Sequence, residues 1–210
     1  NFRLLSKRKN IAKDEDIKAV RFLGDMGYVV TYQQRDPLFS IDFSDPEKLK
    51  VVDKIEMPGF SGYLHPVKDD LLLGIGEAED GNAKISLYDI TDNNKLSIYD
   101  EKEIDHIKYN NVLEDYRKIF IDEENNIAGF GGTDYGDSDD EKEENREQNY
   151  YVLYHYDRDG KLQQIGEYPV KKEYRGFINQ KFIGMRIGTW FYVIPEATSR
   201  QEDMEIVPYS

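Results

Sequence analysis

The sequence predicts an all-β protein of about four repeated units, each made of four antiparallel strands. Residues 19–57 contain four short stretches rich in β-branched and aromatic residues, separated by turns with glycine, proline and aspartate. Eight positions then recur 47 residues later in one ungapped frame. The pairs are Leu38 and Ile85, Asp42 and Asp89, Phe43 and Ile90, Ser44 and Thr91, Asp45 and Asp92, Lys48 and Lys95, Leu49 and Leu96, and Val51 and Ile98. A period in the forties with four strands per unit is typical of a β-propeller blade.

In the first unit we expect strands at 19–23, 28–32, 38–43 and 50–57. Gly24 and Gly27 flank the first turn, since glycine takes positive φ at low cost. Pro37 disfavours helix at the residue before it, and Pro46 presets φ in the turn that follows the third strand. Residues 59–66 are interpreted as a crossing segment that closes the unit.

A third copy lies at Val152–Val170, with Asp157, Lys161 and Leu162 in the matching places and a shorter turn. A fourth, degenerate copy runs from Phe177 to the end, with its clearest strand at Trp190–Ile194. We therefore assign units at 19–66, 67–110, 111–176 and 177–210 to a single domain covering 1–210. A β-sandwich with coincidental similarity is the alternative.

Residues 134–148, DYGDSDDEKEENREQ, contain eight acidic residues against two basic ones and Tyr135 as the only large apolar residue. This composition predicts a solvated or disordered insertion between the second and third strands of the third unit.

The last unit lacks one strand. Phe2–Leu5 is a candidate to supply it as a clasp that closes the ring. Alternatively, the chain is a fragment of a larger propeller, and this second interpretation is the one we expect.

Composition restricts the possible partners. The net charge of −14 disfavours nucleic acid and anionic membrane, and no apolar run approaches the roughly 18 residues that cross a bilayer. The absence of cysteine excludes disulfides, thiolate metal sites and cysteine nucleophiles. The first residues, NFRLLSKRKN, lack the apolar core of a signal peptide, so an exported protein would carry its targeting segment outside this chain.

Residues 20–66, VRFLGDMGYVVTYQQRDPLFSIDFSDPEKLKVVDKIEMPGFSGYLHP, continue through LLLGIGEA and KISLYDITD. This stretch resembles a family of bacterial secreted proteins with a C-terminal β-propeller domain, and its repeat is similar to that of cell-surface propellers. The resemblance covers 19–92 well; later it rests on the hydrophobic pattern, Arg175-Gly176 and Phe182-Ile183-Gly184. It implies a propeller longer than this chain, export, and no established catalytic activity, so it transfers no site residue.

Several acidic residues have the appearance of metal ligands. Ser44-Asp45 and Thr91-Asp92 are expected instead to cap turns through their own backbone, and Asp42 and Asp89 to bond the backbone of a neighbouring loop. Asp157–Gly160 is expected to be a hairpin turn. Asp137, Asp139 and Glu141 lack the glycine and distal glutamate of a calcium loop.

Histidines, glycines and aromatics are the remaining candidates. His65, His106 and His155 lie on different units outside any zinc motif. The glycines at 74, 76, 129, 131 and 132 are not followed by a phosphate-loop lysine and are expected to mark close packing. A set of aromatic residues is a possible sugar-stacking platform, but core packing is the expected role. They are Tyr150, Tyr151, Tyr154, Tyr156 and Trp190.

The sequence thus predicts a non-enzymatic binding or scaffolding module at the cell surface, acting through loops on one propeller face. Its partner would be a protein or a glycan, and no catalytic, metal or cofactor residue is assigned. The alternative is a hydrolase or lyase that acts on polysaccharide with carboxylates at the propeller axis.

Overall fold

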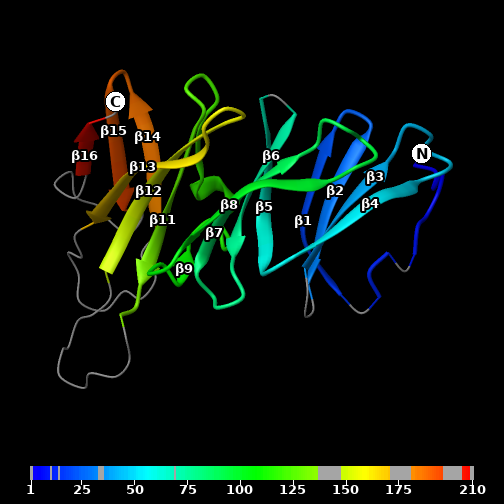
Figure 1. The fold of residues 1–210 in the computed structure, drawn as a ribbon, viewed down its shortest axis with the longest axis horizontal. Coiled ribbons are helices and arrows are strands. Elements are labelled where there is room, and N and C mark those ends of the chain that lie inside the picture. Colours follow the sequence, from blue (N-terminus) through cyan, green and yellow to red (C-terminus); the bar gives the residue numbers. More distant parts are fainter. Residues whose placement is uncertain are drawn as a thin grey trace. The chain divides into compact units, whose positions relative to one another are not determined.

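A computed structural model of the protein describes residues 2–9, 11–13, 15–32, 36–68, 70–136, 148–170, 181–195 and 205–208. Its strands form four antiparallel sheets, in which successive strands are hydrogen-bonded neighbours (Figure 1). The chain divides into two compact units: unit 1 comprises residues 1–80 and 84–102, and unit 2 comprises 81–83 and 103–210. No helix in the described residues is long and apolar enough to cross a membrane.

Unit 1 contains sheet A and most of sheet B. Sheet A consists of β1 (Asp16–Leu23), β2 (Met26–Tyr32), β3 (Asp36–Asp42) and β4 (Lys50–Met57). Sheet B consists of β5 (Phe60–Val67), β6 (Leu71–Glu77), β7 (Ala83–Asp89) and β8 (Ser97–Ile104). β7 and β8 begin and end 47 residues after β3 and β4, so the repeat in the sequence is a repeat of strands.

Unit 2 contains sheets C and D. Sheet C consists of β10 (Phe120–Asp122), β11 (Ile127–Asp134), β12 (Gln148–Asp157) and β13 (Lys161–Val170), with β9 (Tyr109–Asn110) also paired to β11. Sheet D consists of β14 (Phe182–Ile187), β15 (Trp190–Pro195) and β16 (Glu205–Pro208). A short 3₁₀ helix, η1 (Tyr116–Lys118), precedes β10.

The acidic insertion lies between β11 and β12, the second and third strands of the main path through sheet C, as the sequence predicts. The insertion is shorter than the predicted 134–148, because Asp134 at its start and Gln148 at its end pair with each other as strand residues. Residues 137–147, which include Asp137, Asp139 and Glu141, lie outside the described residues.

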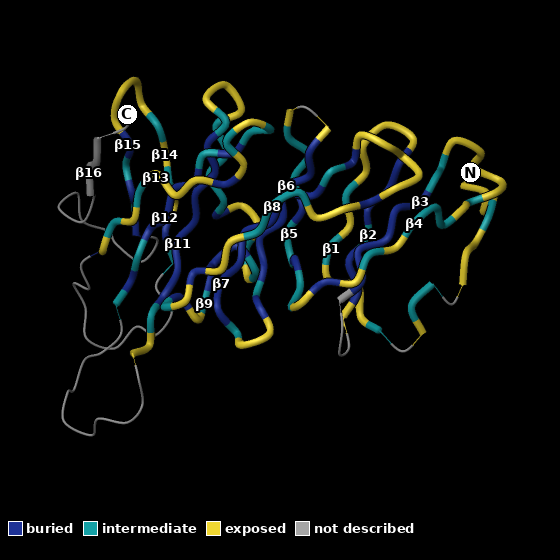
Figure 2. Tube along the Cα trace, in the orientation of Figure 1, coloured by how far each residue is buried: buried dark blue, intermediate teal, exposed yellow. Residues whose placement is uncertain are grey.

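Each unit has its own core, formed between two sheets (Figure 2). The inner strands β6, β7 and β11 are buried on both faces over nearly their whole length, whereas buried and more exposed residues alternate along β14. The core of unit 1 contains Met26, Tyr28, Val30, Leu38, Met57, Leu64, Leu72, Tyr88, Ile90 and Leu96. The core of unit 2 contains Ile127, Tyr151, Leu153, Val170, Phe182, Phe191 and Val193.

The sheets place the unit boundaries differently from the sequence. Most of the segment 59–66, interpreted as a crossing segment at the end of the first unit, belongs to β5, which pairs with β6 and begins sheet B. A register shift between Ser61 and Tyr63 hides the strand period, and Pro66 is tolerated because β5 is an edge strand. The sheets therefore cover 16–57, 60–104, 109–170 and 182–208.

The predicted clasp at Phe2–Leu5 is wrong. These residues form no strand and are exposed. The segment instead lies against the β3–β4 turn, where the Ser6 hydroxyl donates to the carbonyl oxygen of Pro46 at 2.7 Å and Arg3 pairs with Glu47 at 3.8 Å.

The strand glycines mark close packing, as expected. At Gly76 an added Cβ would overlap the carbonyl oxygen of Phe60 on the paired strand. Similar contacts, with side chains or backbone, surround Gly74, Gly129, Gly131 and Gly132. These residues are small because neighbouring atoms occupy the space of a side chain.

Candidate functional site

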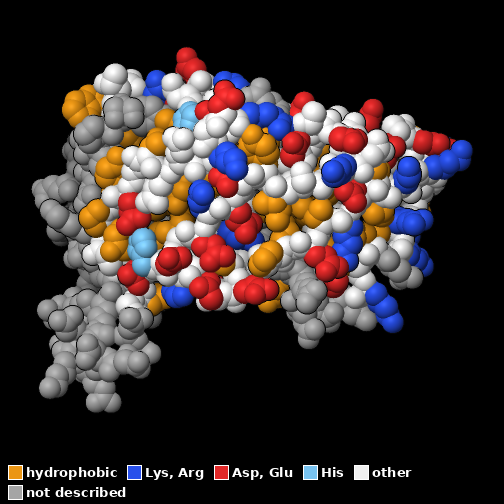
Figure 3. Space-filling view, in the orientation of Figure 1, with side chains coloured by type: hydrophobic (Ala, Val, Ile, Leu, Met, Phe, Trp, Pro, Cys, Tyr) orange, Lys and Arg blue, Asp and Glu red, His pale blue; other side chains and the backbone are white. Residues whose placement is uncertain are grey.

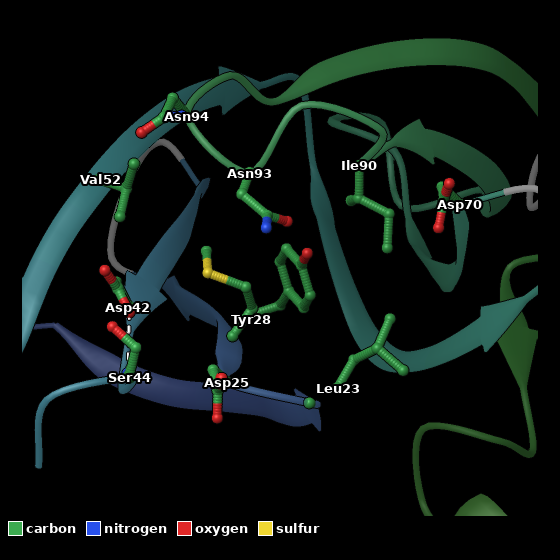
Figure 4. A pocket seen from close by; sticks show the side chains of 12 residues that line it. Leu23, Asp25, Tyr28, Asp42, Ser44, Val52, Asp70, Ile90, Asn93 and Asn94 are labelled. Atoms are coloured by element: carbon green, nitrogen blue, oxygen red, sulfur yellow. Dashed lines mark hydrogen bonds between the residues drawn. The ribbon is translucent and has the colours of Figure 1, made fainter.

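The candidate site is a pocket of about 620 Å³ in unit 1, formed by turns and strand ends of sheets A and B (Figure 4). This volume suits a small molecule or a single side chain of a larger partner. The lining residues are Leu23, Gly24, Asp25, Met26, Tyr28, Asp42, Ser44, Val52, Asp70, Ile90, Asn93 and Asn94.

The first wall is the two-residue turn between β1 and β2. Leu23 pairs with Met26 across it, and Gly24 has φ +56°. Glycine adopts this conformation without a steric penalty, which permits the tight turn. The carbonyl oxygen of Asp25 accepts from the backbone amide of Phe43 at 2.7 Å, so the turn is tied to the end of β3.

The turns after β3 and β7 share one hydrogen-bond pattern. Asp42 Oδ1 accepts from the backbone amide of Ser44 at 2.8 Å, and Asp89 Oδ1 accepts from that of Thr91 at 2.9 Å. The next aspartates act in the same way. Asp45 and Asp92 accept from the amides of Glu47 and Asn94 at 3.0 and 2.8 Å. The predicted turn-capping role is confirmed for Asp45 and Asp92. Asp42 and Asp89 bond the backbone of the turn that directly follows their own strand.

A further hydrogen bond joins the two walls. Oδ2 of Asp53, on β4 of sheet A, accepts from the backbone amide of Leu96, in the β7–β8 connection of sheet B, at 2.7 Å. Val52 and Asn94, close to these residues in the chain, line the pocket. The pocket is therefore held open by a bonded frame rather than by loose loops.

Tyr28 lies at the centre of the pocket, and its side chain and that of Asn93 point toward each other (Figure 4). The residue is 2% exposed. Burial, and to a lesser degree the charge of Asp70, raises the pKa of Tyr28 above its usual value. The hydroxyl therefore stays protonated at neutral pH.

The pocket is acidic. Asp25, Asp42 and Asp70 contribute carboxylates, and no lysine, arginine or histidine is among the lining residues. Hydrogen bonds from the hydroxyl and then the amide of Ser44 lower the pKa of Asp42, with a small contribution from Lys50. Asp42 is therefore ionised at neutral pH.

The polysaccharide-cleaving alternative requires a protonated carboxyl beside an ionised one. Burial raises the pKa of Glu77, although Lys18 opposes the shift. Glu77 ends β6, whereas Asp70 precedes its first residue, so about 20 Å of strand separates them. The pocket carboxylates therefore do not pair with Glu77 as an acid and a base.

A second pocket, of about 540 Å³, lies in unit 2 and includes Ile127, His155, Ile165 and Arg186. Its cation is already engaged, because Nη1 of Arg186 lies 2.6 Å from Oδ2 of Asp122 and its Nε donates to the carbonyl oxygen of Gly188. The pocket of unit 1, which is larger and gathers several polar side chains from two sheets, is the better candidate.

The histidines have separate neighbours. His65 Nδ1 lies 3.0 Å from both Arg21 and Tyr63, and His106 lies 3.2 Å from Glu167. His155 lies 3.6 Å from Asp157. In the ranges that the structure describes, no group of three histidine, aspartate or glutamate side chains is placed to hold a metal ion.

Asp157–Gly160 forms the predicted hairpin turn between β12 and β13, and the amide of Gly160 donates to Asp157. The aromatic residues considered as a sugar-stacking platform are mostly in the core, as expected. Tyr151, Tyr154 and Tyr156 are buried, Tyr150 is half-buried against the ring of His106, and Trp190 is exposed.

The distribution of surface charge is relevant to nucleic acid, a partner that the net charge disfavours. On the face that Figure 3 displays, carboxylates are distributed among the lysines and arginines. This mixture offers no broad basic area to a phosphate backbone on that face.

Comparison with known proteins places these observations in context. A family model described as "Beta propeller domain" matches residues 1–188. An uncharacterized protein of Methanocaldococcus jannaschii is 41% identical over 128 residues, which are 59% of this chain and 20% of that protein. An uncharacterized protein of Archaeoglobus fulgidus is 47% identical over 89 residues, 42% of this chain and 14% of that protein. The chain thus spans a small part of these relatives, both of them archaeal.

Among solved structures, the acylaminoacyl peptidase of Pyrococcus horikoshii matches 95% of this chain and 32% of its own, with a TM-score of 0.54 and 14% identity. At this identity the likeness concerns the fold alone. It agrees with the antiparallel four-stranded sheets described above.

Proposed function

The chain belongs to the β-propeller domain family, and on that premise we propose that it is a non-enzymatic binding or scaffolding module. Its ligand, part of a protein or a glycan, occupies the pocket of unit 1. The observation that carries this proposal is the pocket of about 620 Å³ itself, which turns and strand ends of sheets A and B form and into which the side chains of Tyr28 and Asn93 point. Concave pockets of this size that carry a few polar groups are the usual sites of ligand binding.

The frame around the pocket supports the proposal. The turns are fixed by the aspartate hydrogen bonds and by the bond from Leu96 to Asp53. A preformed site loses little conformational entropy when it binds, which raises affinity.

The test is to close the pocket without disturbing its frame. Asn93 lies in an exposed turn and points toward Tyr28, so Asn93→Trp places an indole in the cavity (Figure 4). The protein and this variant would be applied to arrays of peptides and oligosaccharides. Glu124→Trp, on an exposed turn of unit 2, adds the same side chain where it contributes nothing to the pocket.

We expect the array signals of the unmodified protein to fall at least about tenfold in Asn93→Trp and to persist in Glu124→Trp. Equal signals from both variants would place the binding surface elsewhere and overturn the proposal. Release of reducing sugar from a bound oligosaccharide would favour the polysaccharide-cleaving alternative.

We also propose that residues 1–210 are part of one larger propeller domain. The support is the face of sheet D that points away from the core of unit 2. There Ile183 pairs with Ile194, Met185 with Tyr192, and Ile187 with Trp190, and Ile187 and Trp190 are 54% and 53% exposed. A continuous apolar sheet face of this kind is suited to packing on another sheet.

The measurement is thermal unfolding of Ile187→Glu in the 210-residue chain and in a longer chain that carries the flanking sequence. We expect a loss of several degrees only in the longer chain, where a neighbouring sheet would cover the face. Equal Tm changes in the two chains would contradict this proposal.

We propose, finally, that the protein acts outside the cell. The support is the resemblance of residues 20–66 to secreted and cell-surface propellers. Protease treatment of intact cells is expected to degrade the protein while a cytoplasmic marker survives, and protection of both would overturn the proposal.

A further inference from the structure

A second cluster of polar side chains lies where the first strands of sheets A and B are neighbours. β1 and β5 lie side by side within unit 1 (Figure 1). Nη2 of Arg21, on β1, lies 3.0 Å from Nδ1 of His65, on β5, and the Tyr63 hydroxyl lies 3.0 Å from the same nitrogen. None of these three residues lines the pocket of unit 1, so the cluster is a separate feature.

The hydrogen bonds of this cluster are short of an acceptor. A guanidinium only donates, so Nδ1 of His65 carries the lone pair and the proton of the neutral ring is on Nε2. Burial raises the pKa of Tyr63, although Arg21 opposes the shift, so the phenol keeps its proton at neutral pH and is a second donor. The single lone pair of Nδ1 cannot satisfy both donors fully. A ligand that supplies acceptors would relieve this competition.

The charge of Arg21 has no carboxylate partner among the described residues. The residue is half-buried, and its guanidinium keeps further N–H donors beyond the bond to His65. Asp16, at the exposed start of β1, is the only acidic residue of β1 and β5. In a chain with 42 acidic residues, an arginine without a carboxylate indicates an anion from outside the chain.

We propose that Arg21 and Tyr63 bind the carboxylate of a ligand at the edge between β1 and β5. Both donors lie within hydrogen-bond distance of one atom, so a single carboxylate can reach both. The planar guanidinium donates to the two carboxylate oxygens and retains its bond to His65, while the Tyr63 hydroxyl turns from His65 to the ligand.

A carboxylate suits the cluster better than a phosphate. One guanidinium balances a single negative charge, and the net charge of −14 repels a dianion more strongly than a monoanion. Because the whole protein repels anions, a carboxylate that binds must do so through local contacts. This inference is independent of the proposed function, since it concerns another part of unit 1.

The test uses two peptides that differ only in a carboxylate. The first is acetyl-Gly-Gly-Gly with a free C-terminus, and the second is its C-terminal amide. Binding to the 210-residue chain is followed by NMR chemical-shift titration, in which the Nε–H signal of Arg21 reports contact directly. We expect the acid to bind at least about tenfold more tightly than the amide. Inorganic phosphate is titrated as the competing anion, and tighter binding of phosphate at Arg21 would overturn the assignment to a carboxylate.

Matched variants separate a specific contact from a change in net charge. Arg21→Gln and the control Arg3→Gln remove the same charge, and the Arg3 side chain is 79% exposed. We expect Arg21→Gln to lose at least about tenfold in affinity for the acid and Arg3→Gln to lose less than about twofold. Arg21→Lys keeps the charge without the planar fork and should lose several-fold. The dispersion of each NMR spectrum shows that the variant is folded.

Tyr63→Phe leaves the net charge unchanged and removes only the hydroxyl. We expect it to weaken binding of the acid several-fold, because the carboxylate loses a donor. Equal affinity for the acid and the amide, or equal losses in Arg21→Gln and Arg3→Gln, would overturn the inference. Asn93→Trp, which closes the pocket of unit 1, should leave the affinity for the acid unchanged. A loss there as large as in Arg21→Gln would place the carboxylate in the pocket, and the inference would fail while the proposed function stands.

Discussion

The ammonium of Lys84 lies 3.3 Å from Oε2 of Glu101 on the neighbouring strand, and the lysine side chain has no exposed surface. The same ammonium donates to the carbonyl oxygen of Pro58, and the Ser86 hydroxyl donates to Glu101 at 2.8 Å. The carboxylate therefore compensates a fully buried charge between β7 and β8. Removing one partner of such a pair is costly because the other stays buried and unpaired.

We expect Glu101→Gln to reduce the free energy of unfolding by about 3 kcal/mol or more. The double substitution Lys84→Met/Glu101→Gln should recover much of this loss, because it leaves no unpaired charge. The measurement is urea unfolding followed by circular dichroism. The control is Glu56→Gln at the exposed Lys54–Glu56 pair, 2.9 Å apart, where the loss should stay below about 1 kcal/mol. Equal losses at the two pairs would contradict the role given to burial.

Gly76 tests the close approach of β6 to β5. We expect Gly76→Ala to destabilise the protein by several kcal/mol, since the new Cβ would overlap the carbonyl oxygen of Phe60 and the backbone would have to move. Gly160→Ala is the matched control, because there the Cβ meets first the end of the flexible Gln163 side chain. Thermal unfolding of both variants compares them, and a Tm for Gly76→Ala close to that of the control would refute the close packing.

Tyr88 makes the stability of unit 1 sensitive to alkaline pH. Burial is the main cause that raises the pKa of Tyr88 to about 12, and its hydroxyl is hydrogen-bonded to that of Ser61 at 2.8 Å. Between pH 10 and 12 the unfolded chain releases a proton that the folded protein keeps. Stability is therefore unaffected by this group below about pH 10 and falls above it by about 1.4 kcal/mol per pH unit.

Tyr88→Phe should lower stability by a constant amount near neutral pH, because it leaves the Ser61 hydroxyl without this partner. Above about pH 10 the unfolding free energy of the variant should fall less steeply with pH than that of the unmodified protein. The difference in slope should be about 1.4 kcal/mol per pH unit, which corresponds to one proton. Urea unfolding at a series of pH values measures both quantities. Parallel curves for the variant and the unmodified protein at alkaline pH would rule out this assignment.

The acidic insertion is expected to be dispensable for folding. Asp134 and Gln148 already face each other in the ladder, so deleting residues 137–147 leaves Tyr135 and Gly136 as a two-residue link between paired positions. We expect Tm to change by no more than about 3 °C, because shortening a surface loop alters closure entropy little. A much larger fall, or a Tm of the intact protein that rises with calcium, would show that the insertion packs or binds an ion.

Local chemistry explains why some of these features could be predicted from sequence. Asp42 and Asp89 accept bonds from amides two residues away, so the turn after each third strand depends on neighbours in the chain alone. The offset of 47 residues therefore located β7 and β8 from β3 and β4. The same repeat predicted a β-propeller, and the family match confirms that fold.

Other features depend on partners far away in the chain. Residues 60–67 contain a register irregularity and Pro66, and only pairing with β6 makes them a strand. The clasp at Phe2–Leu5 failed for the same reason, because an extended stretch becomes a strand only where an unpaired edge accepts it.

The sequence by itself determined the all-β class, the repeated turns and the exclusion of cysteine chemistry, because each rests on residue type or on contacts within a few residues. Only the tertiary structure decided where the sheets divide and that Tyr28 meets Asp70 and Asn93 in one pocket. In the sequence, Tyr28 is one of 16 tyrosines and Asn93 is a turn residue. Their chemistry depends on packing between two sheets, which sequence spacing does not encode.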